Sequence, residues 1–266
     1  MSAQPQTEGI ILTEIEDGIG QISMNKTAKR NAFDEDMIAG LTEAFTKMGD
    51  DPEVRVVVLR GEGVSFCAGG DINWMRRTAE YSYEENVADA RNLGALLKLI
   101  NELPKPTIAL VHGHVFGGGV GLTAACDIAI SAAETEFCLS EVRIGLIPSI
   151  IAPYVIGAIG ERQARRYFLT AERFNGGEAR RIGLVHEVVF GHELDKKAIE
   201  IIKSIRDGAP GGQAMGKALI RDIARKPVSD EMIEHTVQRI AEARASNEGK
   251  EGLQAFLNKE EPSWRQ

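Results

Sequence analysis

The chain has 266 residues, which is enough for a large core and long for one plain domain. Its apolar fraction of 43% and charged fraction of 26% are ordinary for a globular protein. The net charge of −8, without a basic block, argues against nucleic acid as a partner, and no apolar run is long enough for a membrane span. The first residues do not resemble a secretory signal, so we expect a cytoplasmic protein.

Strand and helix patterns alternate through the first half of the chain. The runs Ile10–Glu16 and Ile19–Met24 predict a β-hairpin. The next segments along the chain are a helix over Met37–Met48, a strand over Val54–Leu59, a helix over Val87–Ile100, a strand over Thr107–Val111, a helix that ends near Cys126, and a strand over Asp127–Ser131. Strand–turn–helix units recur about every 50 residues, which predicts a layered α/β fold of repeated units.

The pattern becomes mostly helical after Glu161. The predicted helices cover Gln163–Leu169, Leu194–Arg206, Ala214–Arg225 and Asp230–Ala245. In the last of these, Ile233, Val237, Ile240 and Ala241 form an apolar stripe that must be buried against something. We therefore divide the chain into an α/β core, residues 1–207, and a C-terminal helical region, residues 208–266, that packs on the core or on another subunit.

Two glycine-rich segments each follow a strand and open a helix. They are Phe66–Asp71, with the sequence FCAGGD, and Phe116–Gly121, with the sequence FGGGVG. Side chains this small leave backbone N–H groups as the available chemistry, and a helix N-terminus favours an anion. Two such ends that converge would hold an oxyanion formed from a thioester or ester. The alternative is structural, with close helix–strand packing or turns of positive φ.

Glu141 lies in the apolar stretch Phe137–Pro148. An acid there faces solvent, pairs with Arg143, or works in a site. In an apolar pocket, burial would raise the pKa of Glu141 toward the range of a general acid or base. The five histidines and three cysteines show no spacing of a metal site, and no GxSxG motif occurs, so metal or serine-nucleophile catalysis has little support.

Together these residues resemble the crotonase (enoyl-CoA hydratase/isomerase) superfamily over nearly the whole chain. The matching motifs are Arg30–Ala32, Phe66–Ile72, Lys105–Ala109, Gly113, Gly117–Gly119, Cys126–Ile128, Ala179, Gly183–Val185, Glu251–Phe256 and Lys259. The resemblance implies an α/β, crotonase-like spiral of repeated ββα units. It also implies C-terminal helices that build a homotrimer or a dimer of trimers. The implied substrate is an acyl-CoA, so coenzyme A is part of the substrate and no separate cofactor or metal is needed.

The same resemblance implies roles for individual residues. The backbone N–H groups of Ala68 and Gly118 would hold the thioester oxygen, and Glu141 would move the proton. The residues implied for contact with CoA or the acyl chain are Lys29, Arg30, Ala32, Gly70, Asp71, Ile72, Gly117, Gly121, Arg143, Phe256 and Lys259. Of these, Phe256 and Lys259 are expected near the adenine.

One departure from the family pattern narrows the range of expected substrates. Family hydratases carry a first glutamate where this chain has Gly121, and their PGxGGT stretch is replaced here by Pro148–Pro153. A glycine at 121 would leave space and remove a negative charge. Several strings, among them Asp71–Met75, Tyr81–Asn86 and Leu139–Leu146, resemble bacterial 3-methylglutaconyl-CoA and isohexenylglutaconyl-CoA hydratases of leucine and acyclic-terpene breakdown.

We therefore expect a hydratase for a branched, carboxylated 2-enoyl-CoA. Arg143 is a candidate partner for the distal carboxylate, and its alternative role is to pair with an acid on the surface. A Δ3/Δ2-enoyl-CoA isomerase or a generic enoyl-CoA hydratase remains an alternative. An alternative of another class is a CoA-binding or scaffold protein that has lost catalysis.

Overall fold

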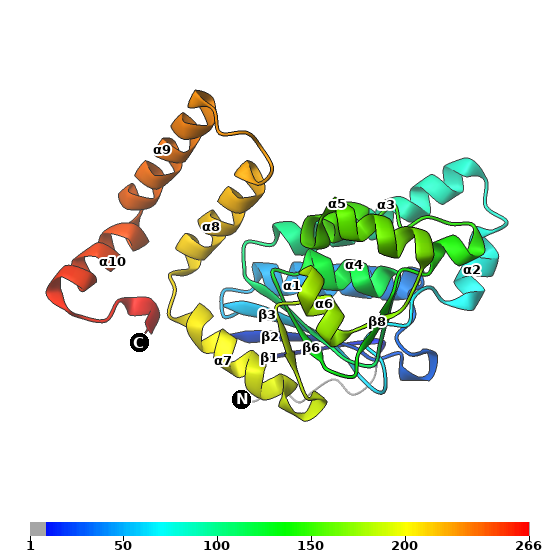
Figure 1. Ribbon diagram of the computed structural model, residues 1–266. Coiled ribbons are helices and arrows are strands. Elements are labelled where there is room, and N and C mark those ends of the chain that lie inside the picture. Colours follow the sequence, from blue (N-terminus) through cyan, green and yellow to red (C-terminus); the bar gives the residue numbers. More distant parts are fainter. Residues whose placement is uncertain (1–8, 266) are drawn as a thin grey trace.

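The computed structural model describes residues 9–265 and contains a six-stranded sheet (Figure 1). Its strands, in spatial order, are β1 (Ile11–Glu16), β2 (Ile19–Met24), β3 (Val56–Gly61), β4 (Thr107–Val111), β6 (Ile128–Ala132) and β9 (Glu187–Val189). The predicted hairpin of β1 and β2 is confirmed, and the remaining neighbours pair in parallel. Parallel pairing needs a crossover between strands, and the intervening helices supply it.

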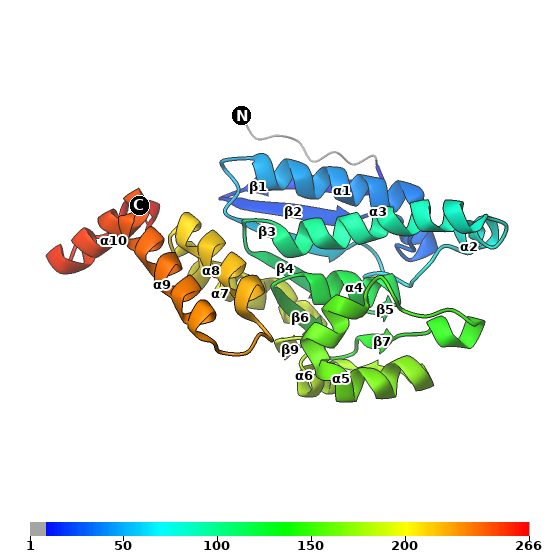
Figure 2. The same cartoon turned by 90° about the horizontal axis from the view of Figure 1, so that it is seen from above.

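Both faces of this sheet are buried, which explains the continuous apolar strands. Successive side chains point to opposite faces, so Val57 and Leu59 of β3 lie in one core cluster, and Val56 and Val58 lie in the other. The first face is covered by α1 (Glu35–Asp50), α3 (Tyr83–Glu102), α4 (Gly118–Ala125) and α5 (Ala152–Thr170) (Figures 1 and 2). The second face is covered by α7 (Leu194–Arg206).

A second, small sheet was not predicted. It consists of β5 (His114–Phe116), β7 (Glu136–Cys138) and β8 (Phe174–Asn175). Strands β5 and β7 are parallel, whereas β7 and β8 are antiparallel. Strands of two or three residues are too short to show an alternating pattern in the sequence.

Several helices differ from the prediction. Helix α5 begins at Ala152, and not at Gln163 as predicted. Its first turns bury Val155 and Ile159, and they are separated from the predicted segment by a break at Gly160, where φ is 73°. Three helices were not delimited from the sequence: α2 (Ile72–Thr78), α6 (Gly176–Ile182) and α10 (Asn247–Asn258). The short 3-10 turns are η1 (Thr27–Lys29), η2 (Glu141–Ile144), η3 (Gly191–Glu193) and η4 (Ser263–Arg265).

Helices α8 (Pro210–Ile223), α9 (Asp230–Ala245) and α10 project from the core on the side opposite α2 (Figures 1 and 2). The Glu248 carboxylate of α10 accepts the N–H groups of Gly211 and Gly212 at the start of α8, each at 3.1 Å. Those donors have no partner within their own helix, so Glu248 joins α10 to α8. The division at 207/208 falls in the turn between α7 and α8 and stays a prediction. No helix between residues 9 and 265 is long and apolar enough to cross a membrane.

Lys217 connects α8 to the core. Its Nζ lies 2.7 Å from Oδ2 of Asp127, and it also reaches the carbonyl oxygens of Ile100 at 3.3 Å and Lys105 at 3.4 Å. The Lys217 side chain is only 13% exposed. A largely buried ammonium with three acceptors therefore joins α8 to the core.

We expect Lys217→Ala to lower the free energy of unfolding by about 1–3 kcal/mol, because it removes the ammonium that donates to the Asp127 carboxylate and to two carbonyl oxygens. Urea unfolding at fixed protein concentration measures this. The exposed Lys250 of α10 makes no ion pair in the described part of the chain, so Lys250→Ala is the matched control. Equal effects of the two substitutions would contradict the role given to Lys217.

Candidate active site

Three segments of the chain end side by side at one edge of the small sheet. Cys67 forms a parallel bridge with Val115 of β5, and β5 pairs in parallel with β7. The pairing continues past the strands, since the Gly117 N–H donates to the Cys138 carbonyl at 2.9 Å. Carboxyl ends of parallel neighbours lie at the same edge. Both glycine-rich segments and the turn that carries Glu141 therefore emerge together.

Glycines allow these segments to approach closely. A methyl group at Gly117, where φ is +50°, would lie 3.3 Å from Oε1 of Glu141 and 4.0 Å from Cα of Gly69. A methyl group at Gly119 would lie 2.9 Å from Cβ of Cys67, which is closer than real side chains tolerate. The structural alternative for the glycines is thus correct in part, and the same packing brings the Glu141 carboxylate to the backbone.

The first glycine-rich segment presents the N–H group of Gly70, and not that of Ala68. The Ala68 N–H donates to the Arg30 carbonyl at 3.0 Å, so the expectation that it holds the substrate oxygen is corrected. Gly70 pairs in parallel with Phe33, whose bonds run from Phe33 to Gly69 and from Asp71 back to Phe33. This pattern turns the Gly70 N–H away from Phe33. Gly70 is exposed, and its N–H has no acceptor among residues 9–265.

The second segment presents the N–H group of Gly118, the first residue of α4. Its N-cap, Gly117, has no side chain to accept this donor. Phe33 connects the two segments, since its backbone pairs with Gly70 while a methyl group at Gly118 would lie 2.7 Å from its ring carbon Cε2. The N–H groups of Gly70 and Gly118, which have no acceptor in the described part of the chain, thus belong to neighbouring backbone segments.

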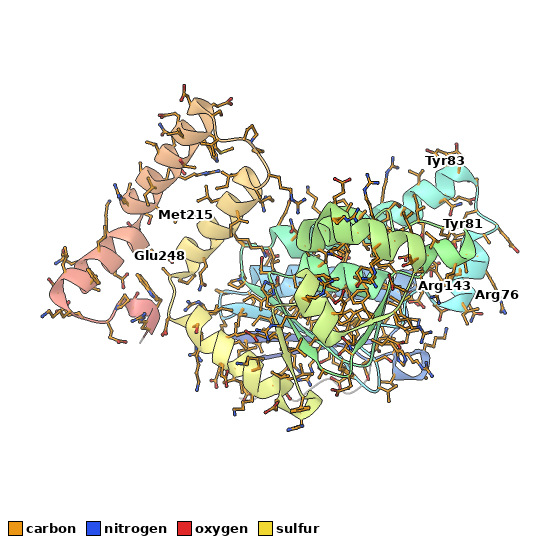
Figure 3. The ribbon with its side chains drawn as sticks, in the orientation of Figure 1. Arg76, Tyr81, Tyr83, Arg143, Met215 and Glu248 are labelled. Carbon is orange, nitrogen blue, oxygen red and sulfur yellow. The ribbon has the colours of Figure 1, made fainter. Side chains whose placement is uncertain are left out.

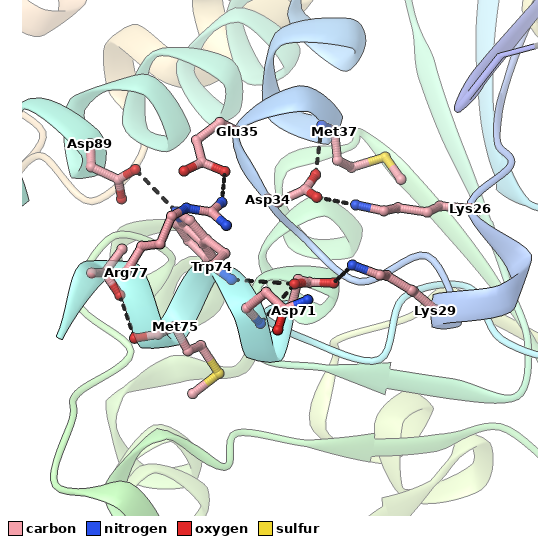
Figure 4. Close-up of polar contacts among 12 residues, drawn as sticks. Lys26, Lys29, Asp34, Glu35, Met37, Asp71, Trp74, Met75, Arg77 and Asp89 are labelled. Atoms are coloured by element: carbon pink, nitrogen blue, oxygen red, sulfur yellow. Dashed lines mark hydrogen bonds and ion pairs between the residues drawn. The ribbon is translucent and has the colours of Figure 1, made fainter. Parts of the chain in front are cut away.

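The N-terminus of α2 is closed by its own cap, contrary to the expectation of two free helix ends. The Asp71 carboxylate accepts the N–H groups of Asn73 at 2.9 Å and Trp74 at 3.2 Å (Figure 4). It also pairs with Lys29 Nζ at 2.6 Å, and this contact lowers the pKa of Asp71. Any anion at this segment must therefore bind at Gly70, ahead of the helix.

Most of the residues expected to contact CoA near the first segment line one cavity of about 490 Å³. Its lining is Ala28, Lys29, Arg30, Ala32, Ala68, Gly70, Asp71, Ile72 and Asn73. Arg30 forms no ion pair in the described part of the chain, so its charge is available to a ligand. Two larger cavities, of about 610 and 930 Å³, include neither Gly70 nor Glu141.

Glu141 is neither exposed to solvent nor paired with Arg143, the two alternatives to a role in a site. Its Oε2 is fully buried without a hydrogen-bond partner among the described residues, and no ion pair joins it to Arg143. Burial raises the pKa of Glu141 above that of an ordinary carboxyl group. The Arg143 guanidinium instead donates to the Ala171 carbonyl at 2.7 Å. A partly buried carboxyl group without an ion-pair partner among the described residues, at the edge where the glycine-rich segments meet, can accept or deliver a proton.

Three of the expected site residues do not take the expected place. Two of them lie away from this edge of the sheet, and the third is closely packed against another residue. Phe256 lies on α10 and Lys259 at its C-cap, on the opposite side of the molecule from α2 (Figures 1 and 2). Gly121 does not leave space, because a methyl group there would lie 2.2 Å from Cγ2 of Ile151. The only sequence signal for Ile151 was its place in the altered stretch Pro148–Pro153.

Known proteins resemble this chain along most of its length. A family model described as "Enoyl-CoA hydratase/isomerase" matches residues 14–266. The enoyl-CoA hydratase ACTT6 of Alternaria alternata is 31% identical over 94% of this chain and 82% of its own.

Solved structures agree with this match. An enoyl-CoA hydratase from Shewanella pealeana is similar with a TM-score of 0.95 and 39% identity over 97% of each chain. Pseudomonas aeruginosa AtuE is similar with a TM-score of 0.92 and 37% identity, over 97% of this chain and 100% of that one. The predicted crotonase fold, with ββα units and C-terminal helices, is confirmed. The chain therefore belongs to the enoyl-CoA hydratase/isomerase family of enzymes.

Proposed function

We propose that the protein reversibly hydrates a branched, carboxylated 2-enoyl-CoA of the 3-methylglutaconyl-CoA type. The observation that carries the enolate chemistry of this proposal is the meeting, at one strand edge, of the Gly70 and Gly118 N–H groups with the Glu141 carboxyl group. Neither N–H group nor Oε2 of Glu141 has a hydrogen-bond partner among residues 9–265. Donors and a proton carrier in this arrangement suit a reaction that passes through an enolate.

In the proposed reaction, water adds across the C2–C3 double bond of the thioester. The N–H groups of Gly70 and Gly118 would stabilise the enolate oxygen, and each such donor typically contributes about 3–4 kcal/mol to transition-state stabilisation. Glu141 would orient the water and exchange a proton with the substrate. Its raised pKa suits this role, because a carboxyl group that titrates closer to neutral pH can both take and return a proton.

The cavity beside Gly70 is our proposed site for the CoA portion. Lys29 and Arg30 on its wall suit phosphate groups, since both carry positive charge at neutral pH. Phe256 and Lys259 would reach a CoA only in a neighbouring copy, because α10 lies on the opposite side of its own subunit (Figures 1 and 2). Phe256 is 81% exposed, which agrees with a role outside its own chain.

Arg143 is our proposed partner for the distal carboxylate of the substrate. It forms no ion pair between residues 9 and 265, and its bond to Ala171 leaves other guanidinium donors available. Arg143 is labelled in Figure 3, on the side of the molecule that carries α2. The glycine at 121 adds no negative charge that would repel such a substrate. The distal carboxylate would also help to activate water, a task for which the described part of the site offers no second glutamate.

A Δ3/Δ2-enoyl-CoA isomerase is the second candidate, favoured by the presence of the single carboxyl group of Glu141, since proton transfer between carbons needs only one acid. Turnover of a panel of enoyl-CoA esters in water labelled with heavy oxygen separates the two reactions. Hydration places the label in the product. Product without the label would support the isomerase.

We expect Glu141→Gln to lower kcat roughly 10²–10⁴-fold, with CoA-ester binding largely kept, because it removes the titrating group but keeps its size. Steady-state kinetics and calorimetric binding measure this. The exposed Glu43→Gln is the control. Near wild-type turnover by Glu141→Gln on every active ester would contradict the assignment.

The same variant tests the burial of Glu141 through stability. A raised pKa means that ionisation of Glu141 disfavours the folded state as the pH rises from the ordinary carboxyl range toward the folded pKa. Glu141→Gln should therefore have a higher Tm than wild type at neutral pH, with the difference shrinking below about pH 4, where the carboxyl group is protonated in both states. A lower Tm at neutral pH would contradict the desolvation of this group.

The substrate class is tested by comparing 3-methylglutaconyl-CoA with its methyl ester. We expect the free carboxylate to give the higher kcat/KM, and Arg143→Gln to reduce this preference roughly tenfold, the equivalent of about 1.4 kcal/mol for one charged contact. The exposed Arg162→Gln is the control for loss of a surface charge. Equal rates for the two esters in the wild type would exclude a role for the distal carboxylate.

We also propose a homotrimer or a dimer of trimers. Ile233, Val237 and Ile240 of α9 are each about half exposed, which leaves an apolar stripe without a partner in the described chain. Light scattering of the full chain should give a trimer or hexamer. Val237→Glu should dissociate it, whereas Gln238→Glu, which adds the same charge beside the stripe, should not. A stable wild-type monomer at micromolar concentration would contradict the proposal.

A further inference from the structure

Two glycines at the start of α4, its N-cap Gly117 and Gly121, each meet a different side chain. Gly117 faces the Glu141 carboxylate, with 3.3 Å between its would-be methyl group and Oε1. Gly121, four residues on, faces Ile151, with 2.2 Å between its would-be methyl group and Cγ2 and 2.9 Å to Cβ. The Gly121 N–H donates to the Gly117 carbonyl at 3.3 Å, so Gly121 lies one turn into α4 from the residue that meets Glu141. Ile151 therefore packs against α4 one turn after the point where the start of this helix meets Glu141.

Ile151 is held firmly in this place. It is only 3% exposed, and its carbonyl accepts the N–H groups of Tyr154 at 3.1 Å and Val155 at 3.0 Å at the start of α5. Leu97 of α3 lies 3.7 Å from the same methyl position of Gly121 and is fully buried. Helices α3, α4 and α5 thus meet at a packed apolar wall, and a core of this density does not yield space without strain.

The surroundings of Glu141 agree with such a wall. Its Oε2 is buried and has no hydrogen-bond partner in the described part of the chain, and α5 packs against both α4 and the turn η2 that carries Glu141. The place into which a longer side chain at position 121 would extend is occupied by Ile151, the N-cap of α5. The small residue at 121 and the large residue at 151 together fill one volume.

We infer that Ile151 is a specificity-determining residue that restricts the active site to one carboxyl group. It fills the volume beside Gly121, so no acidic side chain at 121 can enter the site while the isoleucine is present. Proton transfer is thereby left to Glu141 and to groups that the substrate brings. This inference rests on the proposed role of Glu141, but the packing on which it depends can be tested separately.

The first test is a double-mutant cycle on thermal stability in the full chain. Gly121→Ala should lower Tm by roughly 2–10 °C through overpacking, and Ile151→Gly should lower it by leaving a cavity. The combined variant should lose clearly less than the sum, because the new methyl group enters the vacated volume. Gly216→Ala on α8, where nothing lies within 4 Å of the methyl position, is the control and should add to Ile151→Gly without coupling. Additive effects at 121 and 151 would overturn the inference.

The second test uses the pH dependence of kcat/KM. Gly121→Glu alone should be destabilised and less active on every CoA ester. Gly121→Glu combined with Ile151→Gly should fold and show one more ionisation in its pH profile than Ile151→Gly alone. It should also turn over crotonyl-CoA faster than Ile151→Gly alone. A stable, fully active Gly121→Glu, or a folded double variant without the added ionisation, would overturn the inference. If the wild type acts on no CoA ester, the proposed function fails, while the stability cycle still decides the role of Ile151.

Discussion

The parallel alignment of three short segments is the constraint on which the site depends. Cys67, β5 and β7 run side by side in the same direction, and each of them leads into a functional turn. If any one were antiparallel, its turn would emerge at the other edge. The hydrogen bond from Gly117 to the Cys138 carbonyl extends this register to the point where Glu141 begins its turn. Backbone pairing thus positions groups that are far apart in the sequence.

A second constraint is that the residues at the start of α4 have no side chains where their backbone meets the Glu141 carboxylate. Glycine at 117 and 119 lets α4 approach Glu141 and Cys67 to distances that a methyl group would forbid. The same close packing removes water from Glu141 and raises its pKa. Tight packing and acid–base chemistry are therefore two consequences of one arrangement. These glycines have a structural role and, through it, a functional one.

The sequence was sufficient for the parts of the fold with strong periodicity. The hairpin of β1 and β2, the buried strands β3 and β4, and helices α1, α3 and α7 follow their apolar patterns closely. The small sheet could not be predicted, because strands of two or three residues carry no pattern. The assignment of Ala68 as the donor was wrong for a different reason. Which N–H group stays free depends on the backbone pairing with Arg30 and Phe33, and that pairing is set by the tertiary structure. The role of Ile151 could not be predicted either, since its neighbour Gly121 lies 30 positions earlier in the sequence, in α4.

The central claim is that the N–H groups of Gly70 and Gly118 polarise the thioester carbonyl of a bound substrate. The most direct measurement is infrared difference spectroscopy of an enoyl-CoA with an isotopically labelled thioester carbonyl, bound to the Glu141→Gln variant so that it does not turn over. The account predicts a carbonyl stretch at lower frequency than for the same ester free in water, because two aligned donors in a water-poor site withdraw electron density more strongly than solvent does. A bound ester whose carbonyl stretch stays at its frequency in water would contradict the account.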